Sequence, residues 1–183
     1  KAFSHGITID ERFEPVNPGN SENRVKIRVK AKVKPVSRGA APKLSARLNK
    51  EVYFSREMMK IIISAGSTCH IGLFGWSANS RVVRIYPNQF ITDIVIEKND
   101  VLELPYKGIK IASAPLPGNF SDFESLIVIA NSDPVNFEVL APLPGSNVKA
   151  TIKNSIPVPD FLSELSNFDL NKTRIIFLPY QVQ

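Results

Sequence analysis

Residues 24–36, with the sequence RVKIRVKAKVKPV, alternate between basic and apolar side chains. Successive side chains of a β-strand point to opposite faces, so a strand would separate the cations from the apolar residues. On a helix the same cations would surround the whole circumference. The pattern therefore predicts a strand with one basic face and one buried face. The basic face, called the basic strip below, consists of Arg24, Lys26, Arg28, Lys30, Lys32 and Lys34.

The residues around this strand predict a hairpin that is separate from the rest of the chain. Residues 6–14 form a second candidate strand, and the segment between the two contains the turn residues Pro, Gly, Asn and Ser. A stretch at 35–42 with Pro and Gly then breaks the pattern, as linkers do. We therefore expect residues 1–38 to be an N-terminal hairpin that ends a preceding small domain, and residues 39–183 to be a β-sandwich domain.

The rest of the chain is also predominantly of strand character. The almost continuously apolar segments 58–64 and 125–130 predict central strands that are covered on both faces. Near the C-terminus, Asp160 is expected to cap one short helix that ends near Ser166. The predicted fold class is all-β, a mostly antiparallel β-sandwich with one short helix near the C-terminus. The candidate strands of this domain are 44–49, 58–64, 68–76, 81–86, 91–97, 101–104, 108–112, 125–130, 135–140 and 172–183.

Two residue types refine this prediction. Pro179 has no backbone N–H to donate to a ladder, so the last strand is expected at a sheet edge. Gly72 and Gly75 lie inside a strand candidate, where glycine more often marks a bulge or a close backbone approach than a nucleotide-binding loop.

Composition and charge limit the class of protein. The chain has 183 residues, 43% of them hydrophobic and 22% charged, which is enough apolar material for an ordered core. Its longest uncharged stretch, 61–80, is interrupted by Ser, Gly, Thr, His and Asn, so no transmembrane segment is expected. The formal net charge of +6 is uneven: residues 1–90 carry 16 basic and 6 acidic side chains, whereas residues 91–183 carry 7 and 11.

Catalytic and metal-binding chemistry has little support. Cys69 and His70 are adjacent in a predicted strand, so their side chains point to opposite faces and cannot form a nucleophile–base pair. Cys69 shares its face with Ile71 and Leu73 and is expected to be a buried small hydrophobe. The sequence contains no zinc, calcium or phosphate-loop motif. We therefore predict that the protein is not an enzyme and uses no metal or cofactor.

The basic strip has two interpretations. As a functional surface it would bind an acidic partner, because six like charges on one face repel one another. An acidic protein neighbour ranks first, a wall polymer or anionic lipid second, and nucleic acid third, since the strip contains no aromatic residues for base stacking. The other interpretation is a solvated face whose charges prevent edge-to-edge aggregation.

Aromatic residues and a repeated pentapeptide also have two interpretations each. Phe74, Trp76 and Tyr86, together with Phe90 and Tyr106, could form a binding platform, although such residues more often pack in the core or at its rim. The sequence APLPG occurs at 114–118 and again at 141–145. It indicates either paired recognition loops or two proline-fixed turns, and the second is favoured because the residues that follow the two copies differ.

Several motifs in the middle of the chain occur in a recognisable order. They are LSARLNKEVYFSREMMKIIISA, CHIGLFGW, RVVRIYPNQF, VLELPYKGIKIASAPLPG and ESLIVIANSDPVNF, all within residues 44–137. In this order they resemble the domain of unknown function 4384 family, through Cys69, 86–88 (Tyr-Pro-Asn), 117–118 (Pro-Gly) and 129–130 (Ile-Ala). The turn before residue 58 departs from the family pattern, since Ser55 and Arg56 replace its usual glycine. Residues 6–36 resemble, more weakly, the tail of a lipoprotein or flagellar-assembly domain.

The resemblance implies an exported bacterial β module, periplasmic or outer-membrane-associated, with no established catalytic residues. The expected function is a non-enzymatic interaction and assembly module of a cell-envelope complex, in secretion, flagellar or outer-membrane-associated machinery. Its expected partners are protein subunits with acidic surfaces, and no nucleic acid. The alternative is a binding module for carbohydrate or an anionic cell-wall polymer.

Overall fold

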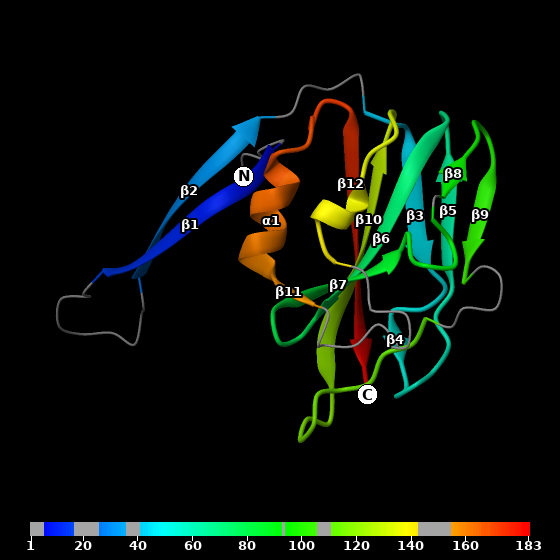
Figure 1. Cartoon of the computed structure of the whole chain (residues 1–183). Helices are drawn as coiled ribbons and strands as arrows, with labels where there is room; N and C mark the ends of the chain where they lie inside the picture. Colours follow the sequence, from blue (N-terminus) through cyan, green and yellow to red (C-terminus); the bar gives the residue numbers. More distant parts are fainter. Residues whose placement is uncertain (1–5, 17–25, 36–40, 93, 106–110, 143–154) are drawn as a thin grey trace. The chain divides into compact units, whose positions relative to one another are not determined.

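The computed structural model describes residues 6–16, 26–35, 41–92, 94–105, 111–142 and 155–183 (Figure 1). For the first two ranges it describes the backbone alone. The chain divides into two compact units, Lys1–Arg38 and Gly39–Gln183. This boundary falls within the segment that composition predicts as a linker.

The first unit contains an antiparallel strand pair. Strand β1 (Gly6–Val16) pairs with β2 (Lys26–Pro35), and the register shifts between Thr8 and Asp10. Both predicted strands are therefore confirmed. A two-stranded hairpin is at best marginally stable by itself in water.

The second unit is an antiparallel β-sandwich, which confirms the predicted fold class. Its large sheet has the strand order β11, β7, β6, β10, β12, β4, with β8 beside the first residues of β6. Its small sheet has the order β3, β5, β9. Of the described strand pairs, only β12 with β4 is parallel. The strands are β3 (Leu44–Leu48), β4 (Val52–Tyr53), β5 (Ile61–Ala65), β6 (Cys69–Ser77), β7 (Arg81–Tyr86), β8 (Val95–Ile96), β9 (Val101–Leu104), β10 (Asp122–Asn131), β11 (Ile156–Pro157) and β12 (Thr173–Val182).

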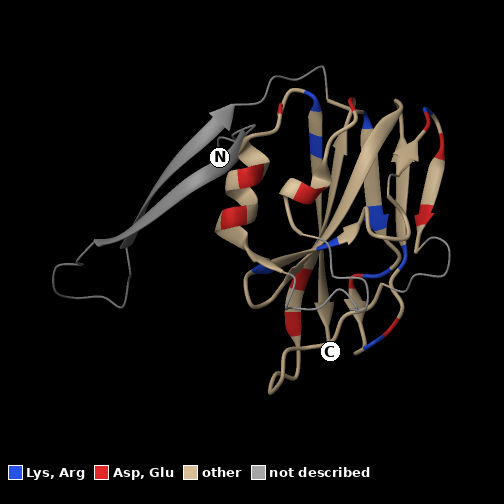
Figure 2. Cartoon of the chain, in the orientation of Figure 1, with Lys and Arg blue, Asp and Glu red and all other residues tan. Residues whose placement is uncertain are grey.

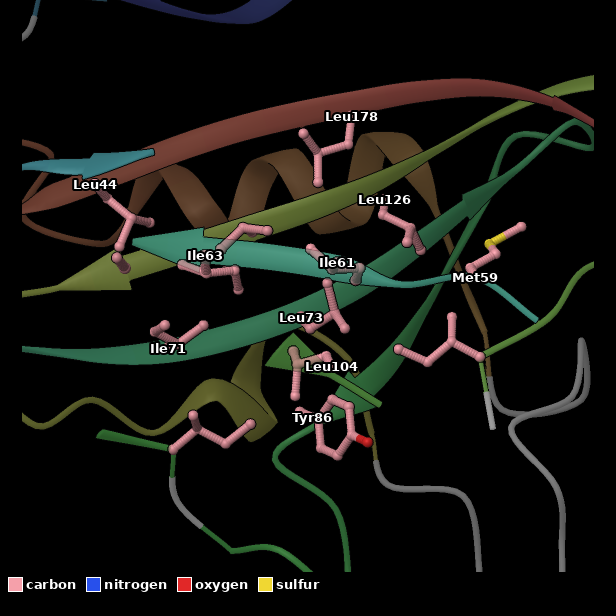
Figure 3. Packing of buried hydrophobic residues seen from close by; sticks show 14 of the residues in the cluster. Leu44, Met59, Ile61, Ile63, Ile71, Leu73, Tyr86, Leu104, Leu126 and Leu178 are labelled. Atoms are coloured by element: carbon pink, nitrogen blue, oxygen red, sulfur yellow. The ribbon is translucent and has the colours of Figure 1, made fainter. Parts of the chain in front are cut away.

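The main core lies between the two sheets. Figure 3 shows side chains of the small sheet, such as Ile61 and Ile63, facing Leu73, Leu126 and Leu178 of the large sheet. These side chains are buried, and period-two alternation along each strand brings them to one face. Apolar burial of this kind is the dominant stabilising contribution in a sandwich.

A second, smaller apolar layer covers the other face of the large sheet, called the outer face below. Helix α1 (Val158–Ser166) lies on this side, opposite the small sheet (Figure 1). Its Phe161 packs against Phe74 of β6 with ring centroids 5.3 Å apart, and Phe74 also contacts Phe137 at 6.3 Å. A Cβ at Gly72 would come within 2.7 Å of the Phe137 ring, which confirms the predicted close approach at this glycine.

Of the predicted strand 91–97 only Val95–Ile96 (β8) is a strand, and the predicted strand 108–112 lies mostly outside the described residues. Three further local predictions are wrong. The 135–140 segment is not a strand: it contains the 3-10 helix η1 (Phe137–Val139), because the Asn136 side chain accepts a hydrogen bond from the Glu138 backbone N–H and turns the chain. Asp160 does not cap α1. The helix begins two residues earlier, after Pro157, and Asp160 lies in its first turn, where a carboxylate favours the helix dipole.

The third error concerns 58–64. Strand β5 is central in the small sheet, but only its Ile61, Ile63 and Ala65 face is buried, because nothing in the described chain covers the other side of that sheet. Strand β10 is central and covered on both faces, as predicted. The expectation that the last strand lies at a sheet edge is also wrong, because β12 lies between β10 and β4 in the large sheet. Pro179 is tolerated there because β4 reaches only Gln181 and Val182, so Pro179 pairs with β10 alone.

Candidate functional site

Part of the outer face of the large sheet is not covered by α1. In Figure 1, β10 and β12 extend below the helix. In one row across the sheet, Ser125 of β10 pairs with Trp76 of β6 on one side and with Pro179 of β12 on the other. In another row, Gln181 of β12 pairs with Phe123 of β10 and with Val52 of β4. Paired residues share a face, and alternation adds Phe177 to the same surface. We call this surface the open face: Val52, Trp76, Phe123, Ser125, Phe177, Pro179 and Gln181.

The open face is apolar, exposed and uncharged. Phe123 is 76% exposed, and Val52 and Phe177 are also exposed. The rings of Trp76 and Phe177 contact each other with centroids 6.3 Å apart and an angle of 66° between their planes. None of its seven residues carries a charge. Single exposed apolar residues are ordinary, but a contiguous group of this kind marks an interaction surface.

The three aromatic residues that the sequence singled out do not lie together. Phe74 is buried under α1. Trp76 lies on the same face, two residues further along β6, and is only partly buried. Tyr86 is buried in the core between the sheets, where Figure 3 shows it near Leu104. A register shift between Leu73 and Phe74 causes this separation, because beyond it Tyr86 pairs with Leu73, an inner-face residue.

The register shift between Leu73 and Phe74 also places a buried cation, Arg84, on the outer face of the large sheet. Arg84 pairs with Phe74 in the ladder, and its side chain is fully buried. Its guanidinium lies 3.6 Å from the carboxylate of Glu138, which is more than half exposed. At this separation the two groups form an ion pair without a hydrogen bond, and none of the three guanidinium nitrogens has a hydrogen-bond partner within the described chain. Burial lowers the pKa of Arg84, and Glu138 partly opposes that shift.

The described residues contain no arrangement typical of a catalytic or metal site. In the ranges that the structure describes, no three His, Cys, Asp or Glu side chains are grouped so that they could hold a metal ion. Cys69 is buried in the main core with Ile71 and Leu73, as predicted, and His70 lies on the opposite face of β6. Among the described helices, none has the length and apolar character needed to cross a membrane.

Burial of Cys69 leads to a prediction about its reactivity. Burial raises the pKa of the Cys69 thiol, so little thiolate forms at neutral pH, and a thiol reagent should react slowly with the folded protein. Labelling followed by mass spectrometry, with and without denaturant, measures this difference. The Cys69→Ser variant should lose about 1–3 kcal/mol of stability, because a buried hydroxyl would lack a partner. Fast labelling of the folded protein would show that the thiol is accessible.

The basic strip falls partly within the described chain. Arg24 lies outside the described residues, whereas Lys26, Arg28, Lys30, Lys32 and Lys34 occupy alternate positions along β2. Opposite them in β1, Glu14 pairs with Arg28 and Asp10 pairs with Lys32. Two cation positions therefore pair with acidic positions of the neighbouring strand, whereas the Lys30 position pairs with the like-charged Arg12 position.

The repeated pentapeptide is described in its first copy only. Residues 143–145 of the second copy lie outside the described residues. The first copy forms a turn in which the Asn119 backbone N–H donates to the Leu116 carbonyl at 2.9 Å, and Gly118 has a φ of 93°. This positive φ favours glycine, which accounts for the Pro-Gly sequence.

The comparisons with known proteins supply no relative. The chain matches none of the family models, curated proteins or solved structures with which it was compared. The resemblance of residues 44–137 to the domain of unknown function 4384 family therefore stays a prediction.

Proposed function

We propose that this chain is a non-enzymatic interaction module that binds a protein partner through the open face, as part of a bacterial cell-envelope assembly. The observation that carries the proposal is the contiguous, uncharged and partly aromatic surface beside α1. The centres of protein–protein interfaces are depleted in charged residues and enriched in Trp, Phe and Tyr. Trp in particular is frequent among the residues that dominate binding energy.

The geometry of the open face favours a protein over a carbohydrate. A sugar ring stacks best on an aromatic plane and is oriented by polar groups around it. The planes of Trp76 and Phe177 are inclined by 66°, so the pair does not form one flat platform. Ser125 and Gln181 are the polar side chains within this surface, which offers a sugar few hydrogen bonds. A protein partner whose apolar surface is complementary in shape fits the open face better.

The cell-envelope part of the proposal depends on the sequence resemblance. That resemblance implies an exported protein in the periplasm or at the outer membrane, and the basic strip suggests a partner with an acidic surface. Fractionation of cells that produce the full-length protein tests the location, and recovery from the cytosol alone would contradict it. The apolar contact through the open face does not depend on this location.

A pair of open-face variants tests the interaction itself. A photo-crosslinking amino acid at position 177 should give a discrete adduct with the partner in cells, whereas the same group at position 90 should not. Phe90 is also 76% exposed but lies outside the open face, in the segment between β7 and β8, which makes it a matched control. With the partner identified, Trp76→Ala should weaken binding about 30-fold or more, since truncation of a central Trp typically costs about 2 kcal/mol or more.

Other outcomes of this experiment separate the alternatives. Equal crosslinking at positions 177 and 90 would contradict the open face as the binding surface. Quenching of Trp76 fluorescence by a soluble glycan, abolished in Phe177→Ala, would favour the carbohydrate-binding alternative instead.

A further inference from the structure

Among the described residues, Arg84 is the buried charged side chain that makes no hydrogen bond. Its three guanidinium nitrogens are buried, and none has a hydrogen-bond partner in the described chain. By contrast, the two buried carboxylates of β10, those of Asp122 and Glu124, each accept hydrogen bonds from two groups. A buried charge without such partners is costly, so a group that supplies hydrogen bonds to Arg84 would be bound favourably.

The guanidinium lies in apolar surroundings. Arg84 pairs with Phe74 across the ladder, and the Phe74 ring contacts the rings of Phe137 and Phe161. Arginine keeps its charge in proteins, and an ion pair is stronger in such surroundings than in water because the effective dielectric constant is lower. Arg84 therefore offers the forked donors of a guanidinium to an anion where water competes weakly.

Glu138 shows how a carboxylate reaches this position, although it does not satisfy Arg84. Its side chain is more than half exposed, so the place of its carboxylate is reached from solvent. The oxygen stays 3.6 Å from the guanidinium, beyond the separation of about 2.7–2.9 Å that charge-assisted hydrogen bonds prefer. The backbone of η1 is itself fixed, by the hydrogen bond to the Asn136 side chain and by that from the Leu140 N–H to the Phe137 carbonyl. A carboxylate that is not attached to η1 is free to approach the guanidinium more closely.

The two helices whose rings contact Phe74 are acidic. Helix α1 carries Asp160 and Glu164, η1 carries Glu138, and neither of these two helices contains a Lys or Arg (Figure 2). Their negative charge repels a dianion such as phosphate about twice as strongly as a monoanion. A planar carboxylate also matches the fork of a guanidinium through two parallel hydrogen bonds. This part of the outer face therefore favours a monocarboxylate over a phosphate.

We propose that Arg84 binds the carboxylate of a small monocarboxylic acid, which takes the place of the Glu138 carboxylate. The bound carboxylate accepts two hydrogen bonds from the guanidinium, and the Glu138 side chain turns into solvent. The site is separate from the open face, and the proposal does not depend on a protein partner.

The stability of the whole chain in acetate tests this proposal. Urea unfolding is followed at constant ionic strength while acetate replaces chloride. A ligand that binds only the folded chain raises the unfolding midpoint in proportion to its occupancy of the site. The native protein should show this rise, and Arg84→Met should not. Glu138→Ala should show it at an acetate concentration about tenfold lower, because the tethered competitor is gone.

Arg81→Met is the matched control. Arg81 lies in the same strand, but its guanidinium donates to the Ser155 hydroxyl at 2.6 Å and to the Ser155 carbonyl. Its replacement should lower stability and leave the response to acetate unchanged. General effects of acetate on unfolding are shared by all the variants, so only a difference between them reports the site. An equal rise in the native protein and in Arg84→Met, or a larger rise in phosphate than in acetate, would overturn the proposal.

A second measurement detects binding without unfolding. In protein labelled with heavy nitrogen in arginine, the Nε–H signal that is missing from the spectrum of Arg84→Met belongs to Arg84. This signal should move as acetate is added and stop moving once the site is full, whereas the signal of Arg81 should stay in place. An Arg84 signal that does not respond to acetate would also overturn the proposal.

The outcome is distinguishable from a failure of the open face. Trp76→Ala should lose the protein partner and keep the response to acetate, and Arg84→Met should do the reverse. Loss of the acetate response in Trp76→Ala would contradict a site that is separate from the open face.

Discussion

The Arg84→Met variant is expected to be more stable than the native protein, by about 1–4 kcal/mol. The guanidinium is fully buried, and among the described residues its only partner is an exposed carboxylate at 3.6 Å, so its desolvation is poorly compensated. Methionine keeps the length of the aliphatic stem and fills irregular space without a charge. Chemical denaturation measures the difference as a change in midpoint at a constant slope.

A double-mutant cycle with Glu138 identifies the cause. Glu138→Ala alone should destabilise the protein, by about 1–2 kcal/mol, because it leaves Arg84 buried without its counter-ion, although solvent reduces the effect of an exposed carboxylate. In the Arg84→Met background the same change should have almost no effect. A loss of stability in Arg84→Met would contradict the argument, since it would mean that the guanidinium has better partners than the ion pair.

The Phe161→Ala variant should lose about 3–5 kcal/mol of stability, the largest loss expected of any single change proposed for this protein. Phe161 is fully buried, and its ring lies between α1 and Phe74 of the large sheet. A helix of nine residues is too short to be stable by itself, so α1 depends on this contact. Thermal or denaturant unfolding measures the loss.

The neighbouring leucine provides the control for this variant. Leu162 is only partly buried on the same helix, and Leu162→Ala should cost clearly less, about 1 kcal/mol or below. Equal losses in the two variants would contradict the prediction, since the buried ring of Phe161 would then stabilise α1 no more than the partly buried Leu162 does, and alanine itself favours the helix.

The sequence was a good guide where a strand has one buried face. Strands β7 and β9 have the bounds that alternation predicted, and Cys69 is buried where its apolar neighbours placed it. The order of the strands in the sheets could not be predicted, since it depends on contacts between distant residues. Strand β4 was missed for that reason: its two residues pair with Gln181 and Val182, more than 100 residues away along the chain.

Local irregularities account for the remaining errors. The Asn136 side chain bonds to the backbone of Glu138, and this competes successfully with the apolar pattern that favoured a strand at 135–140. Likewise, a single register shift in β6 and β7 sends Tyr86 to the main core and leaves Arg84 on the outer face. If the side chains of β7 alternated without interruption from Val82, Arg84 and Tyr86 would lie on the same face of the sheet.

The candidate site was only partly predictable. Trp76 was singled out as an aromatic residue in a strand, but Phe177 lies about 100 positions later and approaches it only through the ladders of β10. Phe123 is exposed, and its strand β10 extends below α1 (Figure 1). No local pattern contains this information.

The position of β12 has a consequence for how the protein is made. This strand comes last among the described strands, yet it lies between β10 and β4 in the large sheet. During synthesis, β10 therefore has one unpaired edge until residues 173–182 leave the ribosome. An unpaired edge with the apolar side chains of β10 is a template for strands of other nascent chains. Folding that waits for so distant a partner is slow, and a chaperone that shields β10 in this interval would raise the yield of the native sheet.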